Sequence, residues 1–452
     1  MPADADLPTP SAAGQGSADP ALPSEEPLGR HLLPDTAQVD GRGRLSVGGV
    51  DLVDLAEEVG TPLFVYDVAH LRARCREAMD AFGGHVAYAT KAFLCKAMAR
   101  ISLEAGMSLD VSSAGELATA VAAGATGERL VLHGNNKSDE ELAEALRLGV
   151  ARIVVDSFEE IGRLGRLLGS GAGGGRSPQE VMVRVTPGVE AHTHEFVMTG
   201  GEDSKFGFSL ASGAADRAAA ELARIPGVVL AGVHAHIGSQ IFRLDAFEQE
   251  VAVLAPFVAR HRLGELCVGG GLGVAYLNGE RAPTISEWAA HLLAAARAAG
   301  LPEGVRLTAE PGRSIVAAAG LTCYRVGTIK ELPGIRTYVA VDGGMSDNPR
   351  PVFYGSGYEA FLPRATTARR PLEARVVGKH CESGDVVVAD ARLPGDLRVG
   401  DVLATPVTGA YGFSMASNYN RVPRPPVLFV EDGASTVVVR RETIEDLLRL
   451  EP

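Results

Sequence analysis

The feature of this sequence that most constrains its fold is a regular alternation between Thr61 and Glu310. Apolar runs of strand length alternate there with longer segments whose apolar residues follow the helix period. Parallel strands buried on both faces have this continuous apolar character, and a helix connects each strand to the next. The predicted strands are Val86–Thr90, Met107–Val111, Arg129–His133, Ala151–Val155, Glu180–Val185, Val228–His234, Glu265–Val268 and Val305–Ala309.

Eight such strands over about 250 residues favour a (β/α)8 barrel, and an open, doubly wound sheet is the alternative. The helices between them are predicted at Lys91–Ala105, Ala114–Ala123, Asp139–Leu148, Ser157–Leu168, Ala211–Arg224, Ala246–Arg260 and Ser286–Ala299, and a further helix, Val68–Phe82, precedes the first strand.

After Arg313 the pattern changes to strand-like runs separated by turns, which is typical of a mainly antiparallel β domain. The segment Ala37–Leu52 also has strand character, and we expect it to join that sheet from the N-terminal side. The expected regions are a mobile tail over residues 1–30, a segment contributing to the β domain over 31–60, the barrel over 61–312 and the β domain over 313–452.

Composition excludes several kinds of partner. The chain has 452 residues and a net charge of −13, so it lacks the basic character of a nucleic-acid-binding protein. No apolar run approaches the roughly 20 residues that span a bilayer, and the N-terminus does not resemble a signal peptide. The five cysteines are few and scattered, which indicates a reducing, cytoplasmic compartment rather than a disulfide framework.

Lys91 ends the first predicted strand, in Tyr88-Ala89-Thr90-Lys91. The carboxyl ends of barrel strands form the active site, so a lysine at this position is a candidate for Schiff-base chemistry with an aldehyde such as pyridoxal phosphate. A solvated lysine at a strand end is the alternative for this residue taken alone.

The other strand ends also carry polar or glycine-rich elements, which a purely structural barrel would not need. They are Asp110, His133 with Asn135, Asp156, Arg184, His234 with His236, the run Gly269-Gly270-Gly271-Leu272-Gly273, and Glu310. The glycine run follows the seventh strand, where barrels often bind phosphate, because backbone without Cβ atoms can approach an anion closely. Tight turns are the alternative explanation for these glycines.

Three further candidates each have two interpretations. Glu310 is either an ion-pair partner of Arg313 or the group that keeps a pyridine nitrogen protonated. His236 is either a structural residue or a ring that stacks on a cofactor. Cys381 is either a small buried residue or a proton donor, since an ordinary thiol pKa of about 8.5 is close to neutral.

We expect no metal site, because His192, His194 and the His234–His236 pair lack a consistent ligand set.

Taken together, the motifs of this chain resemble those of the diaminopimelate decarboxylases, pyridoxal-phosphate enzymes of the alanine racemase/ornithine decarboxylase fold. The matching segments are YATKAF, LDVSSAGEL, HGNNKS, VEAHTHEF with the following TG and DSKFG, HAHIGSQ, GGGLG, EPGRSI, DGGMSDN with the following RP and Tyr354, GKHCESGD and GAYGFSMASNYN. They run in the family's order and cover roughly residues 45–445.

The resemblance implies pyridoxal 5′-phosphate as the cofactor and the decarboxylation of meso-2,6-diaminopimelate to L-lysine and CO2, the last step of lysine biosynthesis. It implies that Lys91 and Cys381 are catalytic; that Lys91, Asp110, His236, Ser239, Gly271, Glu310, Gly312, Arg313 and Tyr411 bind the cofactor; and that Arg313, Arg350, Tyr354, Glu382 and Tyr411 bind the amino-acid substrate. It also implies a homodimer in which Cys381 and Glu382 complete the partner's site.

Three alternatives stay open. A decarboxylase of this fold acting on ornithine, arginine or lysine would not need the pair Arg350 and Tyr354 for a distal carboxylate. A non-catalytic pyridoxal-phosphate carrier could dispense with the β domain and Cys381. A racemase would typically need a tyrosine base opposite the lysine, where this chain offers Cys381.

Overall fold

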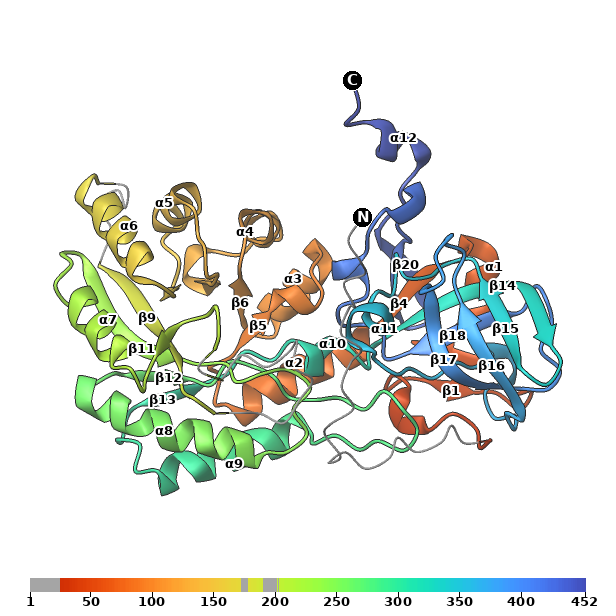
Figure 1. Cartoon of the computed structure of the whole chain (residues 1–452), viewed down its shortest axis with the longest axis horizontal. Coiled ribbons are helices and arrows are strands. Elements are labelled where there is room, and N and C mark those ends of the chain that lie inside the picture. Colours follow the sequence, from red (N-terminus) through yellow and green to blue (C-terminus); the bar gives the residue numbers. More distant parts are fainter. Residues whose placement is uncertain (1–24, 172–177, 190–200, 202) are drawn as a thin grey trace, which may run out of the picture.

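The computed structural model describes residues 25–171, 178–189, 201 and 203–452, which form a barrel and a second, β-rich lobe (Figure 1). The barrel strands are β5 (Ala87–Ala89), β6 (Ser108–Val111), β7 (Leu130–Leu132), β8 (Arg152–Val155), β9 (Gln179–Thr186), β11 (Val228–His234), β12 (Glu265–Cys267) and β13 (Arg306–Thr308). All of these neighbours pair in parallel, and a short strand, β10 (Phe208–Ser209), pairs with β9.

A parallel bridge between Val86 and Ala309 joins the first barrel strand to the last. The backbone N–H of Ala87 donates to the carbonyl of Ala309 at 3.1 Å, and that of Ala89 donates to Pro311 at 3.2 Å. The predicted barrel is therefore confirmed, and the open sheet is wrong, because its edge strands would stay unpaired.

Helices surround the barrel, and their bounds follow the sequence pattern closely. They are α2 (Val68–Ala81), α3 (Lys96–Glu104), α4 (Ala114–Ala122), α5 (Asp139–Leu148), α6 (Phe158–Gly169), α7 (Ala214–Leu222), α8 (Asp245–His261) and α9 (Ile285–Ala298). Side-chain caps fix several of the starts: the Ser138 hydroxyl accepts from the N–H of Glu141, whose carboxylate accepts from the N–H of Ser138. Such reciprocal bonds satisfy N–H groups that have no partner inside the helix.

The helix predicted over Lys91–Ala105 begins later than expected. Lys91 lies in a 3-10 turn, Thr90–Ala92, and Phe93 is extended and fully buried. The Phe93 ring stacks on Tyr66 with centroids 4.3 Å apart, and the helix begins at Lys96 after Cys95 as its N-cap. Burying Phe93 holds the chain extended, so Lys91 remains at the strand end instead of joining the helix.

The second lobe contains a larger sheet with the order β17-β16-β15-β14-β4-β19-β20, in which β18 also pairs with β14. Its strands are β4 (Leu63–Asp67), β14 (Gly320–Leu332), β15 (Arg336–Val341), β16 (Leu372–Val377), β17 (Val386–Leu393), β18 (Val402–Pro406), β19 (Val427–Glu431) and β20 (Ala434–Val439). Most pairs are antiparallel, as predicted; β15 with β16 and β4 with β19 are parallel.

The N-terminal contribution to this sheet differs from the expectation. Ala37–Leu52 does not join it but forms a separate three-stranded sheet from β1 (Gln38–Val39), β2 (Leu45–Val47) and β3 (Val50–Asp51), followed by α1 (Leu52–Val59). These strands are only two or three residues long, with turns between them. The strand that joins the large sheet is β4, buried at every residue, although the range expected for the barrel begins at residue 61.

The remaining elements are short. They are α10 (Arg313–Val316), α11 (Arg350–Tyr354), α12 (Ile444–Leu448) and several 3-10 turns. Within the described residues, no helix is both long enough and apolar enough to cross a membrane.

Candidate active site

One cavity of about 640 Å³ brings together most of the residues that the sequence singled out. This size is in the range of small-molecule and cofactor sites. The predicted site residues that line it are Lys91, Asp110, His236, Ser239, Gly271, Glu310, Gly312, Arg313, Arg350, Tyr354 and Tyr411. The barrel strand ends and the β lobe therefore both contribute to the cavity.

Hydrogen bonds on both sides fix the turn that carries Lys91. The Thr90 hydroxyl donates to the carbonyl of Asp110 at 2.7 Å, which ties the turn to the end of β6. The N–H of Tyr411 donates to the carbonyl of Ala92 at 2.8 Å, which ties it to the β lobe. Lys91 is exposed and lines the cavity, so its amine is accessible to a bound molecule.

At two glycines of the cavity lining, a neighbouring backbone carbonyl comes too close to leave room for a side chain. Gly271 has φ +112°, and a Cβ there would lie 2.4 Å from the carbonyl oxygen of Gly238. A Cβ on Gly312 would lie 2.9 Å from the carbonyl oxygen of Ala89, next to Lys91. Larger residues would move the loop after β12 or the end of β5, so both positions favour glycine for a physical reason.

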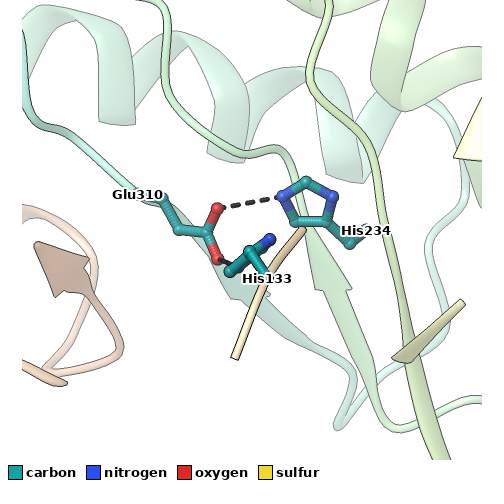
Figure 2. A group of neighbouring side chains, drawn as sticks. All are labelled: His133, His234 and Glu310. Atoms are coloured by element: carbon teal, nitrogen blue, oxygen red, sulfur yellow. Dashed lines mark hydrogen bonds and ion pairs between the residues drawn. The ribbon is translucent and has the colours of Figure 1, made fainter. Parts of the chain in front are cut away.

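Glu310 lies between two histidines (Figure 2). Nε2 of His133 is 2.9 Å from one carboxylate oxygen, and Nε2 of His234 is 2.9 Å from the other. The alternative that Glu310 pairs with Arg313 is wrong, because Arg313 instead donates to the hydroxyls of Tyr276 and Ser239.

The ionisation of this cluster follows from burial and charge. Burial lowers the pKa of His234 to about 4, so its ring is neutral at neutral pH. Burial opposes charge on His133 too, but the carboxylates of Asp110 and Glu310 outweigh it and raise the pKa of His133. Burial also opposes charge on Glu310, yet the neighbouring His133 holds the pKa of Glu310 well below its ordinary value. Glu310 is therefore an anion at neutral pH.

Two other titratable groups line the same wall. Burial raises the pKa of Asp110 to about 6, with Glu310 adding to the effect and His133 opposing it. Burial lowers the pKa of His236 well below its usual value, so this ring is neutral. His236 Nδ1 accepts from the N–H of Gly270 at 3.2 Å, which fixes the ring against the glycine loop. A neutral, oriented imidazole is suited to packing flat against an aromatic ring.

Histidine and glutamate are among the residue types that bind zinc, and the ligand atoms of His133, His234 and Glu310 lie within 4.8 Å of one another. Each Nε2 lies at ordinary hydrogen-bond distance from the carboxylate, and we interpret the cluster as a hydrogen-bonded support for Glu310. Of the histidines weighed as metal ligands in the sequence, His192 and His194 lie outside the described residues.

The lining of the cavity also includes two buried arginines. Arg313 Nη1 donates to the Tyr276 hydroxyl at 2.6 Å, and Nη2 donates to Ser239 at 2.9 Å. Arg350 Nη1 donates to the Tyr358 hydroxyl at 2.5 Å. Two cations in a closed space are costly unless an anion joins them, so this part of the lining is suited to a carboxylate or phosphate group.

Cys381 and Glu382 are the predicted site residues that do not line the cavity. Both are exposed, and Cys381 is the one exposed cysteine of the five. Their loop is ordered by its backbone: the N–H of Cys381 donates to Asn420 at 3.2 Å, and that of His380 donates to Asp385 at 2.8 Å. A single chain therefore presents this segment at its surface.

Sequence reasoning assigned no role to three residues that shape the cavity. His133 and His234 stood at predicted strand ends, and that position was the available signal. Tyr276 follows the glycine run in a loop without helix or strand periodicity, so no local pattern indicated it. All three line the cavity.

The donor set of the cavity fits pyridoxal phosphate. An accessible lysine amine suits an aldehyde, a buried anionic glutamate suits a protonated ring nitrogen, and a glycine loop beside Ser239 and Arg313 suits a phosphate. Residues 68–317 match the family model described as pyridoxal-dependent decarboxylase, pyridoxal binding domain. The fold and the site thus define a pyridoxal-dependent decarboxylase.

The relatives narrow this class. The chain is 44% identical over 433 residues to the diaminopimelate decarboxylase of Halalkalibacterium halodurans, covering 92% of this chain and 97% of that one. It is 45% identical over 439 residues to that of Bacillus subtilis, covering 93% and 98%. A crystal structure of diaminopimelate decarboxylase from M. jannaschii in co-complex with L-lysine has a TM-score of 0.85, with 31% identity and coverage of 92% and 98%. The chain belongs to the diaminopimelate decarboxylase family.

Proposed function

We propose that this protein decarboxylates meso-2,6-diaminopimelate to L-lysine and CO2, the last step of lysine biosynthesis. The observation that carries the proposal is that Lys91, Glu310 and the buried pair Arg313 and Arg350 line one cavity. The lysine and the glutamate suit a pyridoxal cofactor, and the two arginines suit a substrate that keeps a carboxylate after CO2 leaves.

The cofactor is expected to bind between the glycine loop and the end of β5. Lys91 would hold it covalently, His236 would pack on its ring, and Ser239, Gly271, Gly312 and Tyr411 would hold its phosphate, with Arg313 and Asp110 also contributing to its binding. When bound, pyridoxal phosphate supplies an electron sink for the carbon that loses CO2. Glu310 holds a proton on the ring nitrogen, and its low pKa supports this role because an anion is needed there.

Substrate contacts are proposed from both lobes. Arg313, Arg350, Tyr354 and Tyr411 bind the retained carboxylate end and exclude water from it. Glu382 binds the distal ammonium, and Cys381 delivers the proton that replaces CO2.

We also propose a homodimer with shared sites, because Cys381 and Glu382 are exposed and do not line the cavity of their own chain. A partner chain that presents its own 381–382 segment at the cavity would supply both groups.

The cytoplasm is the proposed compartment. Its support is that Cys75, Cys95, Cys267, Cys323 and Cys381 are all free thiols, as expected in a reducing environment.

A decarboxylase of ornithine, arginine or lysine is the less favoured function. Those substrates have no second carboxylate. One of the two buried arginines, Arg313 or Arg350, would therefore have no carboxylate to pair with once such a substrate bound. A likeness in fold to a lysine/ornithine decarboxylase from Vibrio vulnificus, at 21% identity and a TM-score of 0.71, does not bear on substrate choice.

Incubation of the purified holoenzyme with meso-diaminopimelate tests the proposal directly. We expect stoichiometric release of CO2 and L-lysine, identified by chiral chromatography, and negligible turnover of ornithine, arginine and lysine. Turnover of one of these three in preference to diaminopimelate would contradict the proposed substrate, and epimerised diaminopimelate without CO2 would contradict the reaction.

The attachment site can be tested without turnover. We expect the purified protein to be yellow, and borohydride reduction followed by peptide mapping to place the pyridoxyl group on Lys91. Lys96, which begins α3, is the matched control and should stay unlabelled. A label on Lys96, or no label, would contradict the assignment of Lys91.

A further inference from the structure

Tyr276 joins the two cavity arginines. Its hydroxyl accepts from Arg313 Nη1 at 2.6 Å, and the Arg350 guanidinium lies 4.4 Å from the centroid of its ring. Tyr358 packs edge-on against Tyr276, with centroids 5.1 Å apart, and accepts from Arg350 Nη1. Each arginine is therefore held by the same tyrosine, one through the hydroxyl and the other through the ring face.

The groups that contact Arg313 and Arg350 determine whether their positive charges remain available to a ligand. Tyr276 is 4% exposed, and both guanidinium groups are also buried. Their hydrogen bonds within the described residues go to hydroxyl groups, and Arg313 Nε has no hydrogen-bond partner there. A carboxylate in place of the tyrosine would orient the arginines but would cancel their charge. A neutral acceptor and a π-face orient them and leave the charge for a ligand.

The loop that carries Tyr276 is itself held firmly. The Glu280 carboxylate accepts from the N–H groups of Tyr276 and Leu277, at 2.6 and 3.1 Å. Asn278 accepts from the N–H of Gly29 at 2.7 Å and donates to the carbonyl of Pro27 at 3.2 Å. These contacts limit the movement of the ring between the arginines.

The N-terminal segment that reaches this loop is anchored by a buried ion pair. Glu359 accepts from the N–H of Asn278 at 3.1 Å and pairs with Arg370 at 2.7 Å. Arg370 in turn donates to the carbonyls of Glu25 and Glu26, both at 2.8 Å. Residues 25–30 of the tail expected from the sequence are thus tied to the barrel and the β lobe, and residues 1–24 lie outside the described residues.

We propose that Tyr276 is a positioning residue that sets the spacing and orientation of Arg313 and Arg350, and so determines the preference for ligands that carry a carboxylate. The proposal rests on the proposed function in that the substrate is taken to keep one carboxylate. Removal of the hydroxyl takes away one of the two hydrogen bonds of Arg313 and leaves the one to Ser239. Removal of the ring also takes away the aromatic face against Arg350, which keeps its hydrogen bond to Tyr358, so the effect should grow in two steps.

The test compares two ligands that differ by one carboxylate, L-lysine and cadaverine, on the holoenzyme by calorimetry. We expect Tyr276→Phe to weaken L-lysine binding about tenfold, the effect of one hydrogen bond to a charged group, and Tyr276→Leu to weaken it further. Cadaverine affinity should be unchanged in both variants. In turnover, KM for diaminopimelate should rise more than kcat falls.

Controls separate positioning from general damage. Tyr338→Phe removes a hydroxyl from β15, outside the cavity lining, and should leave both affinities unchanged. The visible band of the bound cofactor should be the same in wild type and variants, which reports an intact fold and cofactor site.

Three outcomes would overturn the inference: equal losses for L-lysine and cadaverine, unchanged L-lysine affinity in both Tyr276 variants, or a wild type that does not bind L-lysine. Failure of the wild type to decarboxylate diaminopimelate would instead overturn the proposed function. The binding comparison would still decide the role of Tyr276, because it needs no turnover.

Discussion

Glu310 is buried, its carboxylate is held in one orientation, and it is negatively charged at neutral pH. Both of its oxygens accept from histidine rings at 2.9 Å, which fixes the carboxylate plane. We expect Glu310→Gln to retain the cofactor but to slow decarboxylation about a hundredfold or more, because a neutral amide cannot hold a proton on the ring nitrogen. Single-turnover CO2 release measures the rate, and absorbance measures cofactor content. Near-normal turnover would mean that Glu310 is structural.

The contributions of His133 and His234 to the free energy of unfolding should change with pH in opposite directions. The raised pKa of His133 means that folding favours its protonated form. This stabilisation is fully present below the unfolded pKa of about 6.5 and is lost as pH rises through the folded pKa. His234, with its pKa lowered to about 4, costs stability below pH 6.5, by about 0.8 kcal/mol at pH 6, and nothing at pH 9.

Urea unfolding of the cofactor-free protein at pH 6 and pH 9 tests this pair. We expect the stability lost in His133→Gln to be larger at pH 6 than at pH 9. The loss in His234→Gln should be smaller at pH 6, because the substitution also removes the cost of keeping that ring neutral. If the stability losses of the two variants changed with pH in the same direction, His133 and His234 would not differ in charge.

At the residue scale, the sequence predicts which side chains stand at strand ends but not which of them touch. Glu310 was placed correctly in the cavity, whereas its pairing with Arg313 was one of two open interpretations and is wrong. Three positions separate these residues along the chain, but α10 begins at Arg313 and its side chain reaches Tyr276 and Ser239 instead. Contacts across the barrel depend on register and tilt, which a local pattern does not contain.

The glycine loop after β12 is the element most sensitive to a small substitution. At Gly271 an alanine would combine a left-handed φ with a 2.4 Å approach to Gly238, so the loop must move. We expect Gly271→Ala to weaken cofactor binding about tenfold or more, measured by titration of the cofactor-free protein with pyridoxal phosphate.

The same strand supplies the control for that prediction. Gly264, just before β12, is exposed, and the nearest atom to an added Cβ is 3.8 Å away. Gly264→Ala should bind the cofactor as the wild type does. Equal affinities in Gly264→Ala and Gly271→Ala would show that the loop does not form the phosphate site.

At the element scale, periodicity predicts the barrel because each strand is continuously apolar and each helix is amphipathic. It fails where tertiary contacts decide. Phe93 fits a helical pattern but is drawn into the stack with Tyr66, which delays α3. Residues 63–67 stand before the first predicted helix, Val68–Phe82, and their pairing with β14 and β19, far along the chain, has no local signal.

At the scale of the whole molecule, the cavity lies where the barrel and the β lobe meet. Arg350, Tyr354 and Tyr411 come from the β lobe, and Lys91 and Glu310 come from the barrel. The same lobe presents Cys381 at its surface, on a loop whose backbone is fixed by Asn420 and Asp385. An ordered, exposed loop that carries a thiol and a carboxylate is suited to completing a site on another chain.

A mixture of two inactive variants tests this arrangement. Neither Lys91→Ala nor Cys381→Ala homodimers should turn over well, because each lacks one group at both sites. Re-equilibrated mixtures should contain about half heterodimers, each with one intact site that takes Lys91 from one chain and Cys381 from the other. Roughly a quarter of wild-type activity should therefore return if chains exchange freely and the sites act independently. Recovery no greater than the sum of the two variants, with exchange verified by tagged chains, would place each site within one subunit.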